Sequence, residues 1–267
     1  MITIGQFMGF EEDFREPEGW FSWQHLTYVS VIIAVAVLLA LCLGRRYRDK
    51  SIQEKKKPLR IAAIVMLISE ITKIILYCVQ DGNVGIVRSN FPLFLCSIIF
   101  FTLPMAAFGK KWISYGAMNF TFAFGMLCCL AGTYLAGNIY ANNPIFCYSC
   151  IASNIAHCIA GFSAIYIGSS GLAKLHRGDQ RIMALILGAF EAVALIVDIL
   201  QTGTDYENNY MFFMRPDGTP FSICMDLVHD IQPLYTAFVA ALYFAYLFLF
   251  ILVWRIINRK NDGISHT

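Results

Sequence analysis

Long apolar stretches recur along nearly the whole chain and alternate with short polar segments. An α-helix rises about 1.5 Å per residue, so about 20 apolar residues are needed to cross the hydrocarbon core of a bilayer. Each stretch is expected to be a helix, because backbone N–H and C=O groups need partners within lipid. Seven stretches, of which the third is short, fit this rule: residues 25–44, 59–80, 91–108, 112–137, 145–167, 182–201 and 233–256.

The composition supports a membrane environment. Hydrophobic residues make up 58% of the 267 residues and charged residues only 14%, whereas charged residues supply about a quarter of a soluble domain. The expected fold is all-α, a polytopic membrane bundle of seven transmembrane helices. Ser22, which follows Trp20, is expected to begin the first helix at the membrane interface. We expect an acidic extracytoplasmic segment at 1–19, a transmembrane domain at 20–256 and a cytoplasmic tail at 257–267.

The basic residues predict the orientation, because cytoplasmic loops carry an excess of Lys and Arg. The opposite loops hold few bases, so the N-terminus is expected outside and the C-terminus inside, in a multi-pass protein of the cell membrane. A net charge of +2 gives no reason to expect nucleic acid as a partner. The bases lie in alternate loops: Arg45, Arg46, Arg48, Lys50, Lys55, Lys56, Lys57 and Arg60, then Lys110 and Lys111, then Lys174, Arg177 and Arg181, then Arg255, Arg259 and Lys260.

Ionisable residues inside the apolar stretches are candidates for function, because a charge at the centre of a membrane helix costs about 2.5–3.5 kcal/mol. Glu70 and Lys73 are three residues apart and can form an ion pair on one helix face. A purely structural pair is an equally good explanation. Glu191 and Asp198 are two turns apart on one stripe, which suggests a polar cavity.

Two histidines lie within or beside the apolar stretches. His157 is near the middle of the fifth stretch, with Asn154 about one turn before it, and His25 is at the outer end of the first. A neutral imidazole can exchange a proton near neutral pH, so His157 is a candidate general base. His157 could instead serve as a hydrogen-bond partner between helices, and His25 could lie in the headgroup layer.

Cys147 and Cys150 form a Cys-x-x-Cys motif near the outer end of the fifth stretch. This spacing suits redox or metal chemistry. No second pair with ligand spacing follows it, so no metal site is expected and a packing role is favoured. Small residues in the fourth and fifth stretches are expected to allow close helix contacts; they include Gly125, Gly132, Ala160 and Ala164.

Five short motifs, read in order, resemble the bacterial integral membrane family called YwaF, which is similar to the eukaryotic transmembrane protein 164 group. The resemblance covers most of the chain. The motifs are Phe-Ser-Trp-Gln-His-Leu at 21–26, Phe-Pro-Leu-Phe-Leu-Cys at 91–96, Ser-Asn-Ile-Ala-His at 153–157, Asn-Tyr-Met-Phe at 209–212 with Arg215 and Pro216, and Pro-Leu-Tyr at 233–235.

The resemblance implies an expectation about chemistry. The eukaryotic relatives are regarded as acyltransferases that act on phospholipids through the cysteine of an Asn-Pro-Cys-His sequence. This chain keeps Pro92, but Leu93 and Phe94 occupy the positions of the cysteine and the histidine. Cys96 lies three residues after Leu93, on nearly the same helix face, so it is a candidate replacement nucleophile. His157 is the candidate base that would activate it.

Two functions remain open. The first is a lipid acyltransferase or lipid hydrolase with Cys96 as acyl carrier, His157 as general base and Glu70 or Glu191 orienting it. The second is a non-enzymatic transporter, lipid-binding protein or sensor with a polar cavity. Membrane lipids are the expected partners, a lipid or acyl ester is the candidate substrate, and no cofactor is expected. The sequence leaves the substrate and the oligomeric state undefined. The expected cavity residues are Glu70, Lys73, Asn154, Glu191, Asp198 and His25.

Overall fold

The computed structural model of the chain describes residues 3–10, 16–173, 175, 178–217 and 219–262. Residues 11–15 of the acidic segment, Lys174, Arg177 and the last five residues of the tail lie outside these ranges. The contacts divide the chain into two compact units, each described by itself below. Unit 1 comprises Met1–Pro92 and Cys96–Lys174, and unit 2 comprises Leu93–Leu95 and Leu175–Thr267. The apolar pattern does not indicate this division.

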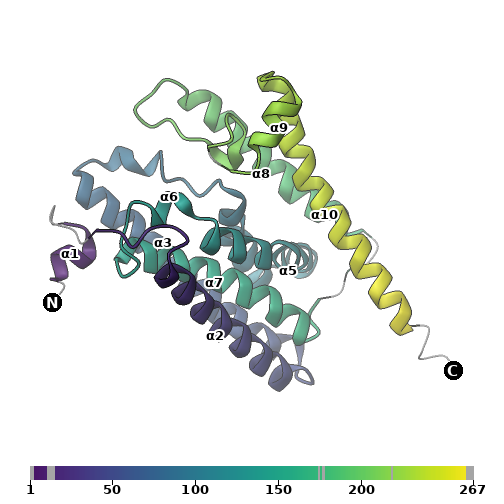
Figure 1. Cartoon of the computed structure of the whole chain (residues 1–267). Coiled ribbons are helices and arrows are strands. Elements are labelled where there is room, and N and C mark those ends of the chain that lie inside the picture. Colours follow the sequence, from purple (N-terminus) through teal and green to yellow (C-terminus); the bar gives the residue numbers. More distant parts are fainter. Residues whose placement is uncertain (1–2, 11–15, 174, 176–177, 218, 263–267) are drawn as a thin grey trace. The chain divides into compact units, whose positions relative to one another are not determined.

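Every regular element in the described ranges is helical, which confirms the expected all-α fold. In unit 1 the helix α7 packs against α2, α3 and α5, while α4 packs against α3 and α5 (Figure 1). Its elements are α1 (Ile4–Met8), α2 (Trp23–Tyr47), α3 (Ile52–Asp81), η1 (Val84–Val87), η2 (Leu95–Ile98, of which Leu95 belongs to unit 2), α4 (Ile99–Phe108), α5 (Lys111–Tyr134), α6 (Gly137–Tyr140) and α7 (Tyr148–Ser169).

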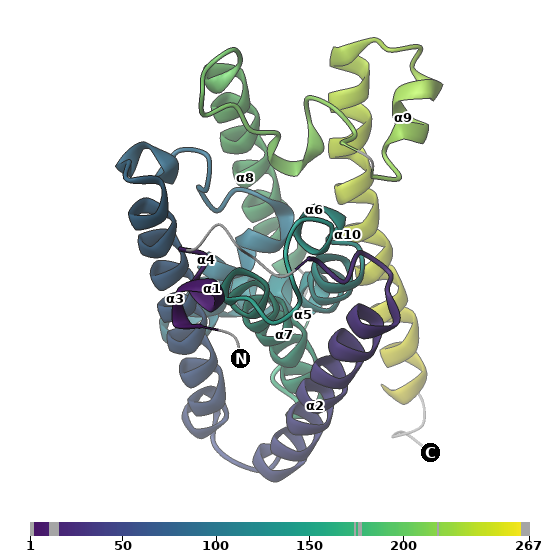
Figure 2. The same ribbon diagram turned by 60° about the vertical axis from the view of Figure 1, so that its left-hand side comes forward.

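Unit 2 is built on two long helices. The helix α8 packs against α10, and the short helix α9 also lies against α10 (Figure 2). A loop with the short helix η3 leaves the end of α8 and returns to pack against it. The elements are α8 (Asp179–Gln201), η3 (Tyr210–Phe212), α9 (Ser222–Leu227) and α10 (Gln232–Asp262).

Local capping explains where the first helices begin and end. The hydroxyl of Ser22 accepts a hydrogen bond from the His25 N–H (3.2 Å), which confirms the predicted start of α2. Ser51 and Glu54 form a reciprocal capping box at the start of α3. Gly82 ends α3 with a positive φ of 64°, a conformation that glycine adopts without steric strain.

Part of the basic run after α2 is used inside unit 1. The Lys56 ammonium donates a hydrogen bond to the Ser114 hydroxyl (2.6 Å), which donates in turn to the Ala106 carbonyl. Arg60 donates to the Ala107 carbonyl (3.3 Å) at the last turn of α4. Positive groups are favourable at a helix C-terminus, so these two bases fasten the turn between α4 and α5 to α3.

Four of the long helices, α2, α3, α8 and α10, present large apolar side chains on their outer faces. Water would disfavour so much apolar surface, whereas lipid accommodates it. By contrast, most of α5 and α7 is buried, so they form the core of unit 1. The chain is therefore a multi-pass membrane protein. Exposed side chains include Val31, Val35, Leu38, Ile61, Ile68, Ile196, Leu200, Leu249 and Leu252.

Among the described residues, six helices are long and apolar enough to cross a membrane: α2, α3, α5, α7, α8 and α10. They occupy six of the seven expected stretches. The third stretch, expected at 91–108, becomes helical only at Leu95, where four residues of η2 precede the ten of α4. This element is shorter than the roughly 20 residues of a full span. The expected N-out and C-in orientation stays a prediction.

The contact between α5 and α7 depends on small residues, as the sequence predicts. A Cβ atom at Gly125 would overlap the Ala160 carbonyl oxygen and lie 3.0 Å from the Ala164 Cβ. A Cβ atom at Gly132 would overlap the His157 ring. The two backbones therefore approach more closely than any larger side chain would permit.

Replacing Gly125 by alanine is expected to destabilise the protein by about 1–3 kcal/mol, because the added methyl group must push α5 away from α7. Gly188→Ala is the matched control, since a Cβ there would meet only the Phe244 ring at 3.5 Å. Unfolding in detergent, followed by circular dichroism, measures both. Equal stability of the two variants would contradict the proposed close contact.

Candidate functional site

The expected ion pair between Glu70 and Lys73 is present on α3. The Lys73 Nζ and Glu70 Oε2 atoms are 2.7 Å apart, and the side chains are 20% and 11% exposed, respectively. Each charge thus compensates the other in a largely buried position. Such a pair holds both side chains on one face of the helix.

Lys73 also lines a cavity of about 370 Å³ within unit 1. The walls come from α1, the last turns of α3, the segment before α7 and the first turns of α7. Polar side chains dominate, and the Lys73 ammonium gives the cavity a cationic group. Its polar lining includes Lys73, Tyr77, Gln80, Asn142, Ser149 and Ser153.

Cys96 lies in η2, half-buried within unit 1. Its thiol has a hydrogen bond with the Ser97 side chain and lies within electrostatic range of Lys73 and Glu70. The thiol of Cys128, on α5, is another neighbour. Cys96 therefore has protein neighbours on several elements of unit 1 and is close to the ion pair.

His157 lies on α7, where its ring packs against Gly132 of α5 and hydrogen-bonds to the backbone of Cys128. It also lies within electrostatic range of Lys73. The charge of Lys73 thus acts on both Cys96 and His157. Within the described ranges, however, no hydrogen bond joins the Cys96 thiol to the His157 ring, so the catalytic pair stays a prediction.

His25 and Asn154 take part in a separate network around Tyr140. The Tyr140 hydroxyl donates to Asn154 Oδ1 (2.8 Å), and the Asn154 amide donates to the Cys150 carbonyl (2.8 Å). His25 stacks on the Tyr140 ring, with centroids 3.9 Å apart. Its Nδ1 accepts from the Phe21 N–H, and its Nε2 donates to the carbonyl of residue 133 (3.1 Å). Both ring nitrogens have partners, which indicates a structural role for His25.

Cys147 is buried in the apolar cluster that also holds Cys150, in agreement with the packing interpretation of the Cys-x-x-Cys motif. It is the N-cap of α7, where its sulfur accepts a hydrogen bond from the Cys150 N–H (3.4 Å). It also lines the 370 Å³ cavity. Cys150 is fully buried and packs in the apolar cluster with Val29 and Tyr140. Among the described residues no cluster of three or more metal-ligating side chains is found.

Glu191 and Asp198 belong to unit 2, so they are described apart from the cavity of unit 1. Both side chains are buried on α8. Asp198 Oδ1 accepts a hydrogen bond from the Tyr210 N–H (2.9 Å), which ties η3 to the end of α8. Glu191 Oε1 has no hydrogen-bond partner in the part of the chain that the structure describes. Asp198 Oδ2 also has none there, so the two carboxyl groups differ in the backbone hydrogen bond that Asp198 Oδ1 accepts.

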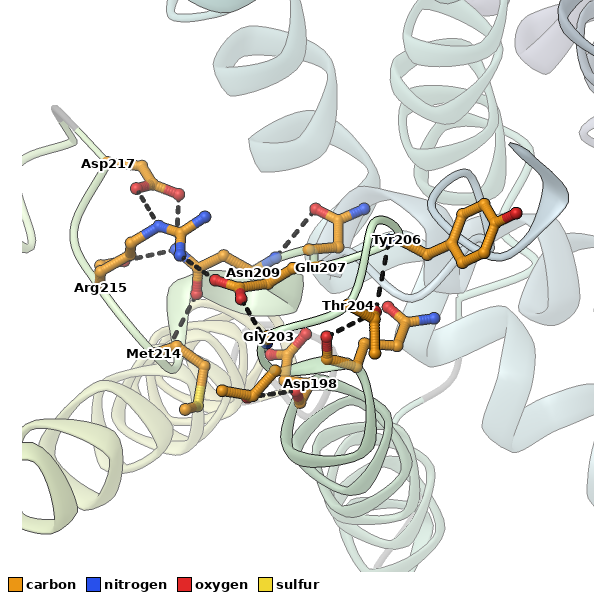
Figure 3. A network of polar contacts seen from close by, with 12 residues as sticks. Asp198, Gly203, Thr204, Tyr206, Glu207, Asn209, Met214, Arg215 and Asp217 are labelled. Atoms are coloured by element: carbon orange, nitrogen blue, oxygen red, sulfur yellow. Dashed lines mark hydrogen bonds and ion pairs between the residues drawn. The ribbon is translucent and has the colours of Figure 1, made fainter. Parts of the chain in front are cut away.

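The loop that follows α8 contains a polar network centred on Arg215 (Figure 3). The guanidinium contacts Glu207 Oε1 (2.7 Å) through Nη1 and Asp217 Oδ1 (2.8 Å) through Nε. Asn209 donates to the Arg215 carbonyl and to Asp217 Oδ2, and accepts from the Met214 N–H. These contacts close the loop on itself.

The same contacts shift two pKa values. Hydrogen bonds from the Gly203 N–H and the Arg215 guanidinium lower the pKa of Glu207. In return, Glu207 and Asp217 raise the pKa of Arg215. Opposite charges within hydrogen-bond distance favour the charged form of each partner. The loop is therefore an ionised, hydrogen-bonded structure near neutral pH.

Comparison with protein families identifies the chain. A model of the TMEM164 family matches residues 20–258. The chain belongs to the TMEM164 family. This match confirms the relationship to the transmembrane protein 164 group that the motifs indicated. Comparisons with curated proteins and with solved structures gave no significant match.

The structure places the positions at which this TMEM164 family protein departs from the expected Asn-Pro-Cys-His motif. Leu93 is buried. The Phe94 ring contacts those of Tyr210 and Phe212, with centroids 5.2 and 6.1 Å apart. Both residues belong to unit 2, where Phe94 packs with η3. The positions expected to hold the cysteine and histidine are therefore occupied by packing residues.

Sequence reasoning missed several polar residues of this TMEM164 family protein. Tyr140 and Tyr77 lie at the end of helices, where an aromatic residue is expected for interfacial reasons alone. Arg215 and Asn209 belong to the motif at 209–216, which does not by itself predict a network. The signal that could have predicted this network is the presence of Glu207 and Asp217 in the same short loop, eight and two residues from Arg215.

Breaking the ion pair is expected to destabilise the protein. Glu70→Gln leaves Lys73 charged in a largely buried position and should lower stability by about 1–3 kcal/mol. The double variant Glu70→Gln/Lys73→Gln should recover part of this loss, since no charge is left unpaired. The free energies of unfolding of Glu70→Gln, Lys73→Gln and the double variant, compared with wild type, measure the coupling between the two side chains. Strictly additive losses would mean that the two side chains do not interact.

The loop network is expected to open in acid. The ordinary pKa of Glu207 is 4.5 and the folded value is lower, so its contribution is present above 4.5 and is lost as the pH falls through the folded pKa. The Gly203 N–H, which donates to Glu207 Oε2 (2.7 Å), should then lose protection from hydrogen exchange.

Hydrogen–deuterium exchange of the 203–217 peptide, corrected for the intrinsic rate at each pH, measures this opening. Glu207→Gln is the control, and its exchange should lack the acid-dependent step. An unchanged step in that variant would assign the titration to another group.

Proposed function

We propose that this TMEM164 family protein transfers an acyl group from a membrane lipid through the thiol of Cys96, with His157 as the base. The observation that carries the proposal is the position of Lys73. Its ammonium lines the unit 1 cavity and lies within electrostatic range of both Cys96 and His157. A lipid ester whose polar part enters this cavity would meet the Lys73 ammonium at its wall, and its carbonyl group would have to pass that wall to reach the thiol and the imidazole.

The proposed reaction begins with attack of the Cys96 sulfur on the ester carbonyl carbon. A carbon–sulfur bond forms, the ester carbon–oxygen bond breaks, and the thiol proton passes through His157 to the departing alcohol. Attack by a second alcohol or by water then releases the acyl group and restores the thiol. Lys73 would stabilise the negative charge that develops on the carbonyl oxygen.

A hydrogen bond between the two predicted catalytic groups has to form during this reaction, since His157 hydrogen-bonds to the backbone of Cys128. Catalytic hydrogen bonds often form only when substrate is bound. The Glu70 carboxylate would hold Lys73 in place through their 2.7 Å ion pair. Glu70 is thus a positioning residue in this proposal.

A second candidate function is binding of a lipid without chemical change. The packing of Leu93 and Phe94 in place of a cysteine and a histidine favours it. In that case the cavity would hold the polar part of a lipid beside Lys73, and Cys96 would remain unmodified.

Acyl labelling distinguishes the two functions. Protein in nanodiscs that contain phospholipid with a radiolabelled acyl chain should acquire a hydroxylamine-sensitive label on Cys96. Cys96→Ala should abolish the label, and Lys73→Met should reduce it about tenfold or more, because the oxyanion loses its charge partner. Autoradiography after electrophoresis and peptide mass spectrometry measure the label and its position.

The matched control is Cys42→Ala, which removes an exposed cysteine of α2 and should leave labelling unchanged. Labelling that persists in Cys96→Ala would rule out the proposed nucleophile. Lipid that co-purifies with wild-type protein but never labels it would support the binding function instead.

A further inference from the structure

Unit 2 contains a cavity of its own between α8 and α10. Its volume is about 590 Å³, within the range of about 300–1,000 Å³ that small-molecule sites occupy. All of its lining residues belong to α8, α10 or the loop that follows η3. Most of the wall is apolar, including Ala192, Leu195, Ile199, Phe213, Ala237 and Ala240.

Glu191 is the only acidic or basic side chain among the residues that line this cavity. It is 7% exposed, and its Oε1 atom has no hydrogen-bond partner among the described residues. A buried polar atom in a native structure is normally hydrogen-bonded. A carboxyl oxygen without a partner in an apolar wall is therefore a place where a donor group of a ligand can bind.

The other polar side chains of the cavity use their donors internally. The Gln232 amide donates to the Phe213 carbonyl (2.8 Å) and to the Thr236 hydroxyl (3.2 Å). The Thr236 hydroxyl donates to the Phe213 carbonyl (2.8 Å). Since these donors already have hydrogen-bond partners, the wall offers a ligand mainly acceptor groups. The strongest acceptor is the Glu191 carboxylate.

We propose that this cavity binds a lipophilic ammonium, with Glu191 as its counter-ion. The ammonium donates hydrogen bonds to the carboxylate, and the hydrocarbon part of the ligand packs against the apolar wall. An amphiphile with one cationic end matches a site that combines one acidic group with an apolar surface. The proposal does not depend on Cys96, because every residue that it uses lies in unit 2.

Binding of octylamine to the full-length protein in nanodiscs tests this site. The neutral analogue octanol has the same chain length and lacks the charge. Calorimetric titration, with empty nanodiscs subtracted to remove partition into lipid, should give octylamine an affinity about tenfold or more above that of octanol. This factor corresponds to one charge-assisted hydrogen bond.

Two variants locate the binding. Glu191→Gln keeps the size of the side chain and removes its charge, so octylamine should bind about tenfold or more weakly while octanol is unaffected. The fold should persist, because this change removes an uncompensated acidic group. Asp205→Asn removes an exposed carboxylate of unit 2 that lies outside the cavity and should leave octylamine affinity unchanged.

A third variant tests the cavity itself. Ala237→Phe places a ring in the proposed binding space and should abolish saturable octylamine binding, provided that circular dichroism shows a native helix content. Equal affinities for octylamine and octanol would overturn the proposal. So would full octylamine binding by either Glu191→Gln or a folded Ala237→Phe protein.

Discussion

Charges in the interior of this protein have to be compensated by the protein, because the outer faces of its long helices are apolar. The Glu70–Lys73 pair satisfies this constraint within a single helix, with 2.7 Å between the charged atoms. An ammonium that would otherwise be expelled from lipid is thereby held at the wall of the unit 1 cavity. This retained charge acts electrostatically on both Cys96 and His157.

The packing of α5 on α7 determines how closely these groups can gather. Gly125 and Gly132 lack the side chains that would hold the two helices apart, and the second glycine leaves the space in which the His157 ring lies. The imidazole can then reach the backbone of Cys128 on α5. Close packing and candidate chemistry are therefore linked in unit 1. A larger residue at 132 would displace the histidine as well as the helix.

The spacing of residues along one helix predicts those contacts that form between residues close in sequence. The Glu70–Lys73 pair and the Ser22 cap depend on residues three apart, so both could be inferred from the sequence. The cavity wall could not be inferred, because it joins Cys147 to α1 and to the end of α3 through contacts distant in sequence. Likewise, hydropathy finds an apolar stretch at 91–108 but cannot show that Leu95 begins its helix. It also cannot reveal two units, since both have membrane-facing apolar surfaces.

The two carboxyl groups on α8 show why a shared stripe does not establish a shared role. Asp198 is near the end of the helix, where the loop returns and the Tyr210 N–H can reach it (2.9 Å). Glu191 is two turns earlier and faces an apolar cavity, whose wall includes Phe213 and Met214 of the same loop. The first carboxylate therefore stabilises the fold of unit 2. The Oε1 atom of the second has no partner among the residues that the structure describes, and the energetic disadvantage of burying an uncompensated acid is the strongest physical reason to assign it a ligand.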